Sequence, residues 1–127
     1  MDPEAVAFAH RMFDLARAGA VDDLVAYVEA GVPVDLTDAA GNTVLMLAAY
    51  HGHAELVRAL AALGADVDRM NDRGQTPLAG AVFKGERPVV EVLLAAGADA
   101  SLGTPSALDT ARFFGKDSLV ELLCRGA

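Results

Sequence analysis

The sequence predicts an all-α solenoid of about four stacked helix–turn–helix repeats. Two observations predict this fold class: a pattern that recurs every 33 residues, and a composition rich in small apolar residues. Hydrophobic residues make up 54% of the chain, aromatic residues only 6%, and there is no Trp. Such a composition is typical of a folded protein rather than a disordered one, and its many alanines favour closely packed helices.

The repeat is visible in two parts of the unit. Residues 38–45 recur as residues 71–78, and residues 63–68 recur as residues 96–101, each 33 positions later. Glycines at positions 19, 52 and 85 keep the same spacing, whereas Gly115 comes three residues early. We therefore expect one domain, residues 1–127, divided into repeats at about 5–37, 38–70, 71–103 and 104–127.

Polar residues mark where the first helix of each repeat begins. Thr43 and Thr76 are predicted N-caps, because a threonine oxygen accepts a hydrogen bond from an otherwise unpaired backbone N–H. Pro77 follows at the first helical position, where its missing N–H costs nothing. Ser106, with Asp109 three residues later, has the spacing of a capping box that opens the fourth repeat.

Apolar residues then recur at helical spacing and define the faces expected to be buried. In the first helices these are Leu45, Ala48 and Ala49 with their counterparts Leu78, Ala81 and Val82. In the second helices they are Leu56, Val57 and Leu60 with their counterparts Val89, Val90 and Leu93. Gly31, Gly64 and Gly97 are expected to end the second helices in the left-handed conformation.

This unit resembles the ankyrin repeat. The pattern Gly-x-Thr-Pro-Leu-x-x-Ala…Gly…Gly-Ala-Asp stands in full at residues 74–99 and nearly so at residues 41–66. The flanking segments are degraded copies, as expected for repeats that cap the two ends of a stack. The family often has a histidine after Thr-Pro-Leu that ties adjacent turns together, but Met46 and Ala79 stand there. This departure from the family pattern predicts looser turns and a greater dependence on apolar stacking.

Charge and cysteine content exclude several classes of function. A net charge of −8 repels phosphates, which disfavours nucleic acids and anionic membranes as partners. The apolar runs are too short to span a bilayer, and the N-terminal residues lack the features of a signal peptide. The single cysteine, Cys124, fits a reducing compartment and is expected to be a small buried apolar residue. We therefore expect a cytoplasmic protein.

Few residues suggest chemistry. His51 and His53 are the strongest candidates for a metal site, but they flank a turn glycine. Because zinc requires three or four converging ligands, these two histidines alone do not indicate a zinc site. The third histidine, His10, lies about a repeat away. Neither a nucleophile elbow nor a phosphate-binding glycine loop occurs in the sequence. We expect no catalytic residue, no cofactor and no resident metal.

Three aromatic residues hold equivalent positions two residues before the turn glycine: Tyr50, Phe83 and Phe113. The resemblance implies that they form a ladder on the concave face, where ankyrin repeats present turn tips and the ends of first helices. An alternative is that the rings only fill space between repeats. The other expected partner-binding residues are Arg17, Asn42, His51, Arg73, Gln75, Lys84 and Phe114.

The resulting hypothesis is a monomeric module that binds an unidentified partner protein on its concave face. The positive charge of Arg17, His51, Arg73 and Lys84 would select an acidic partner segment. One alternative is a self-associating scaffold that pairs through its last helix, near Leu119, Leu123 and Cys124. The other is a metal-binding protein that uses His51 and His53.

Overall fold

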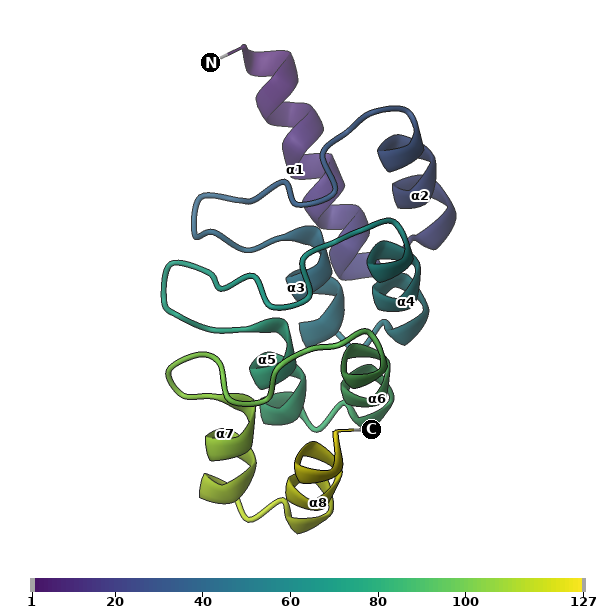
Figure 1. Cartoon of the computed structure of the whole chain (residues 1–127). Helices are drawn as coiled ribbons and strands as arrows, with labels where there is room; N and C mark the ends of the chain where they lie inside the picture. Colours follow the sequence, from purple (N-terminus) through teal and green to yellow (C-terminus); the bar gives the residue numbers. More distant parts are fainter. Residues whose placement is uncertain (1, 127) are drawn as a thin grey trace.

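Helices follow one another in pairs along the chain (Figure 1). The computed structural model describes residues 2–126, and within them every regular element is a helix, so the all-α prediction is confirmed. The helices are α1 (Pro3–Ala18), α2 (Val21–Glu29), α3 (Val44–Tyr50), α4 (Ala54–Ala62), α5 (Pro77–Lys84), α6 (Arg87–Ala95), α7 (Ala107–Phe113) and α8 (Asp117–Arg125).

The helices stand in two rows (Figure 1). The first helices of the pairs, α1, α3, α5 and α7, pack side by side, each against the next. The second helices, α2, α4, α6 and α8, form the outer row, and the long loops between pairs all project to the opposite side (Figure 1). This arrangement is that of the predicted solenoid, in which each repeat packs against its neighbours in the stack.

The predicted caps begin the first helices. Thr43 Oγ1 accepts a hydrogen bond from the Met46 N–H at 3.1 Å, and Thr76 Oγ1 accepts one from the Ala79 N–H at 3.1 Å. In the fourth pair, Ser106 Oγ accepts from the Asp109 N–H at 3.1 Å. The three caps fix where α3, α5 and α7 start, and so fix the register in which these helices stack.

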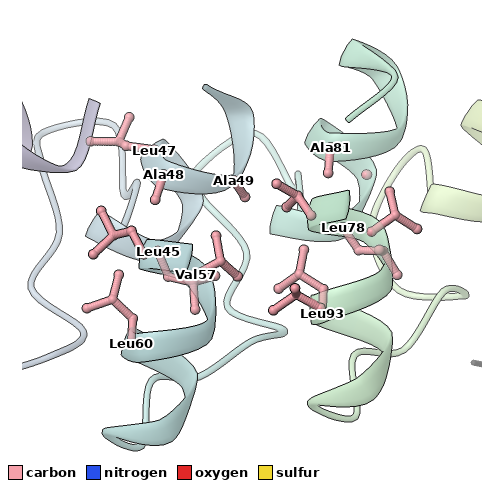
Figure 2. Packing of buried hydrophobic residues seen from close by; sticks show 14 of the residues in the cluster. Leu45, Leu47, Ala48, Ala49, Val57, Leu60, Leu78, Ala81 and Leu93 are labelled. Carbon is pink, nitrogen blue, oxygen red and sulfur yellow. The ribbon is translucent and has the colours of Figure 1, made fainter. Parts of the chain in front are cut away.

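The predicted apolar faces form one continuous core. All twelve apolar residues named for the two central repeats are fully buried, and several appear in Figure 2 between α3, α4, α5 and α6. The cluster extends from Met12 on α1 to Leu123 on α8. The repeats therefore share their core and do not each enclose a separate one.

The turns are tied together without the histidine that the family often carries. Met46 and Ala79 are buried at that position. Asn71 Nδ2 donates to Asn42 Oδ1 at 2.9 Å, and the Asp72 N–H donates to the Ala40 carbonyl at 3.0 Å. Backbone and amide bonds thus join neighbouring turns in place of an imidazole.

One feature of the fold was not predicted, and one prediction was wrong. Helix α1 has 16 residues and extends well past the first helices of the other pairs, with Phe8 packed edge-on against Tyr27 at 5.2 Å (Figure 1). The prediction that Cys124 is buried was wrong, because its thiol is exposed. Leu119, Leu122 and Leu123 form the buried side of α8, and no helix of residues 2–126 covers the side on which Cys124 lies.

The caps give a test of this account of helix register. Thr43→Ala and Thr76→Ala are each expected to lower the free energy of unfolding by about 1 kcal/mol, because the capped N–H loses its partner. Urea unfolding followed by circular dichroism measures the change. Ser118→Ala, at an exposed position on α8, is the control and should leave the midpoint unchanged. Wild-type midpoints for both threonine variants would contradict the role given to the caps.

Candidate protein-binding face

A groove of about 910 Å³ runs along the side of the first helices that faces the projecting loops. Its floor comes from α3, α5 and α7, and its rim comes from the tips of the loops. Most of the lining is apolar, with amide and charged side chains near the loop tips. The groove therefore combines an apolar floor with a polar rim, which is typical of binding surfaces.

Most of the residues predicted to bind a partner meet in this groove. Eight of the ten line it: Asn42, Tyr50, His51, Arg73, Gln75, Phe83, Phe113 and Phe114. Lys84 stands beside the groove, with its Nζ 5.0 Å from the centre of the Tyr50 ring. Arg17 lies at the end of α1, where it pairs with Asp14 at 3.1 Å.

The aromatic side chains of this face are open to solvent. Tyr50 is 40% exposed, Phe83 and Phe114 are each 51% exposed, and Phe113 is 82% exposed. These rings are therefore not enclosed core residues, because between two fifths and four fifths of each is open to solvent. Four exposed rings along one groove are unusual for a surface that contacts only water.

The rings do not form the simple ladder that equal spacing suggests. Phe114 touches both Phe83 and Phe113, with ring centres 5.5 Å and 4.9 Å apart. Tyr50 stacks edge-on with His51 at 5.6 Å and lies under the Lys84 ammonium. Three phenylalanines thus gather at one end of the groove, and Tyr50 with two basic groups stands at the other.

The floor of the groove was not predicted as part of the site. Its residues include Met46, Leu47, Ala79, Gly80 and Thr110. The helical spacing of apolar residues marks a different set of positions as core, and it does not show that these five residues form the bottom of a groove. Asp109 had been assigned only to helix capping, yet its exposed carboxylate also lines the groove.

Comparison with known proteins identifies the family. The family profile described as ankyrin repeats (3 copies) matches residues 12–104. The chain belongs to the ankyrin repeat family. A Pseudomonas aeruginosa protein named "Putative ankyrin repeat protein PA3287" is 47% identical over 58 residues, which cover 46% of this chain and 34% of that protein. The match thus spans about a third of that relative's length.

Ankyrin repeats are protein–protein interaction modules, and the family is one of interaction domains rather than enzymes. Within residues 2–126 no three His, Cys, Asp or Glu side chains lie close enough together to hold a metal ion. None of the helices in the same part of the chain is long and apolar enough to cross a membrane.

His53 has a structural contact in this ankyrin stack. Its Nε2 lies 2.6 Å from the Arg17 carbonyl oxygen, which can only accept, so Nε2 must carry the proton and donate it. The ring also occupies the space beside Gly19, where a Cβ would lie 2.5 Å from its Nδ1. His53 therefore links the second repeat to the end of α1.

His51 differs, because it faces the groove and its pKa is perturbed. Partial burial lowers its pKa below the ordinary value of 6.5, and the positive charges of His53, Arg17 and Lys84 lower it further. The imidazole is consequently neutral at pH 7. The folded state binds this proton less readily than the unfolded state, so the contribution of His51 to stability falls as the pH drops below 6.5.

This environment gives a direct test by proton NMR. The ring of His51 should titrate with a midpoint below 6.5, and Lys84→Gln should raise that midpoint because it removes a neighbouring positive charge. Arg58→Gln, on the outer surface of α4, removes the same charge away from the groove and should leave the midpoint unchanged. A midpoint at or above 6.5 in the wild-type protein would contradict the assigned surroundings.

Proposed function

We propose that this ankyrin stack is a non-enzymatic, monomeric module that binds a partner protein in the groove of its first-helix face. The observation that carries the proposal is the set of four exposed aromatic rings along that groove, Tyr50, Phe83, Phe113 and Phe114. Keeping such rings in water is unfavourable, and a partner that covers them recovers the free energy of burial.

The shape and chemistry of the groove support a protein as the ligand. A cavity of about 910 Å³ that is open along its length suits a peptide segment or a loop rather than an enclosed small molecule. At the rim, Asn42 and Asn71 are bonded to each other and to neighbouring loop residues, whereas the Gln75 amide NH2 group is placed to donate to a partner's backbone carbonyl. Aromatic residues surrounded by such a rim are the usual hot spots of protein interfaces.

The proposal also covers catalysis, cofactors and cellular compartment. We assign no catalytic role, because the groove brings together no nucleophile with a neighbouring base. We assign no cofactor, since the lining has no cluster of groups suited to phosphate or metal. We place the protein in the cytoplasm, because one exposed thiol, Cys124, is best kept in a reducing compartment.

Affinity capture tests the proposal. Wild-type protein and the triple variant Tyr50→Ala, Phe83→Ala, Phe113→Ala are used as baits in a lysate of the source organism. The triple variant should lose its partner by at least about tenfold, because truncating one hot-spot aromatic typically costs more than 1.4 kcal/mol. Met70→Ala, which removes an exposed apolar side chain outside the groove, should capture the same partner as the wild-type protein.

The circular dichroism spectrum of the triple variant should match that of the wild-type protein, which shows that the variant is folded. A folded triple variant that retains every partner would show that the rings are not the interface. Sedimentation of the wild-type protein tests the monomer assignment separately, and a concentration-dependent dimer would favour self-association instead.

A further inference from the structure

Gly80 lies in the interior of α5 and lines the groove. Its backbone does not have the positive φ that makes glycine necessary at the turns of this protein. A Cβ built on Gly80 would meet only Tyr50 Cδ1 within 4 Å, at the comfortable distance of 3.6 Å. Neither backbone conformation nor crowding therefore requires glycine at this position.

Glycine at this place weakens the helix. A glycine inside a helix loses more backbone entropy on folding than an alanine does, so Gly80 destabilises α5 relative to Gly80→Ala. The fold would gain from a side chain here. What glycine supplies instead is open space at the floor of the groove.

The neighbouring repeats show how this space is bounded. The positions equivalent to Gly80 are Leu47 in α3 and Thr110 in α7, and both carry buried side chains that line the same groove. Of α3, α5 and α7, only α5 lacks a side chain at this level. The floor of the groove therefore carries no side chain at Gly80, where the nearest atom to a built Cβ is Tyr50 Cδ1 at 3.6 Å; we call this part of the floor, beside Tyr50 and Phe83, the Gly80 hollow.

Positive charge stands at the tyrosine end of the hollow. Lys84 Nζ is 5.0 Å from the centre of the Tyr50 ring, and neither Lys84 nor Arg73 has an ion-pair partner within residues 2–126. Arg17 and Lys84 lie close enough to His51 to act on its titration. One carboxylate, Asp109, lines the opposite end. In a chain with a net charge of −8, these cations mark the place where an acidic group is best received.

We propose that the Gly80 hollow receives one large apolar side chain, aromatic or leucine, from a partner segment that carries acidic residues next to it. This inference rests on the proposed function and specifies the chemistry of the partner. The apolar side chain lies on the groove floor at Gly80, beside the rings of Tyr50 and Phe83. The neighbouring carboxylate pairs with Lys84.

The probe for the test is a phage-displayed library of random 12-residue peptides, selected on the immobilised wild-type protein. The enriched peptides should share one aromatic or leucine residue flanked by Asp or Glu. One enriched peptide is then synthesised with a fluorescent label, and its affinity for variants is measured by fluorescence polarisation.

The variants separate a binding role of Gly80 from a structural one. Gly80→Leu should weaken the peptide by roughly tenfold or more, the scale on which hot-spot contacts act, because it fills the hollow. Gly80→Ala should bind more weakly than the wild-type protein while its thermal midpoint rises by about 2–5 °C, since the helix gains an alanine. Lys84→Gln should weaken the peptide, and Arg58→Gln, on α4 away from the groove, should not.

Several results would overturn the inference. Enriched peptides that are basic, or that lack a large apolar residue, would give the hollow a different ligand. If folded Gly80→Leu binds the labelled peptide with unchanged affinity, the large apolar side chain does not bind at Gly80. This holds even if the triple aromatic variant still fails to capture its partner from lysate. A library that yields no binder, or a wild-type dimer that Gly80→Leu disrupts, would replace the peptide with another occupant. Retention of every lysate partner by the triple variant is the separate failure that removes the proposed function itself.

Discussion

The structure depends on one constraint: a single repeat cannot bury its own apolar face and must cover it with its neighbours. Burying one leucine contributes about 1.5–3 kcal/mol, whereas a threonine cap contributes about 1 kcal/mol. Stacking therefore dominates stability, and the caps mainly choose the register. Leu45 and Leu78 are fully buried because α3 and α5 pack against each other in consecutive repeats (Figure 2).

The same constraint produces the binding face. Once the first helices stack in register, equivalent positions of successive repeats come into line. Ala49 faces the core and is buried, while Tyr50, one residue further round the helix, emerges on the loop side. Phe83 and Phe113 emerge at the equivalent place in the next two repeats. The groove and its exposed rings are therefore a geometric consequence of how the core is buried, and only the choice of side chains is free.

Much of this could be predicted from the sequence because the repeat signals are local. Thr43 and Thr76 predict where their helices begin, because each side chain accepts a hydrogen bond from a backbone N–H of the first turn. The spacing of apolar residues predicts the buried faces. What could not be predicted depends on contacts between repeats. The exposure of Cys124 is decided by which side of α8 packs inward, and the position of Phe114 between Phe83 and Phe113 is decided by side-chain packing. The open space at Gly80 appears only when the side chains of its neighbours are placed.

Hydrogen–deuterium exchange of the protein with and without its captured partner tests the central claim most directly, because it locates the covered surface without a mutation. If the groove binds the partner, amide protection should increase in residues 71–84 and 105–114, which supply most of its lining. The second helices α4 and α6 should exchange as in the free protein. Protection confined to α4 and α6, with the first helices and loop tips unchanged, would contradict the assignment of the loop-side groove as the binding face.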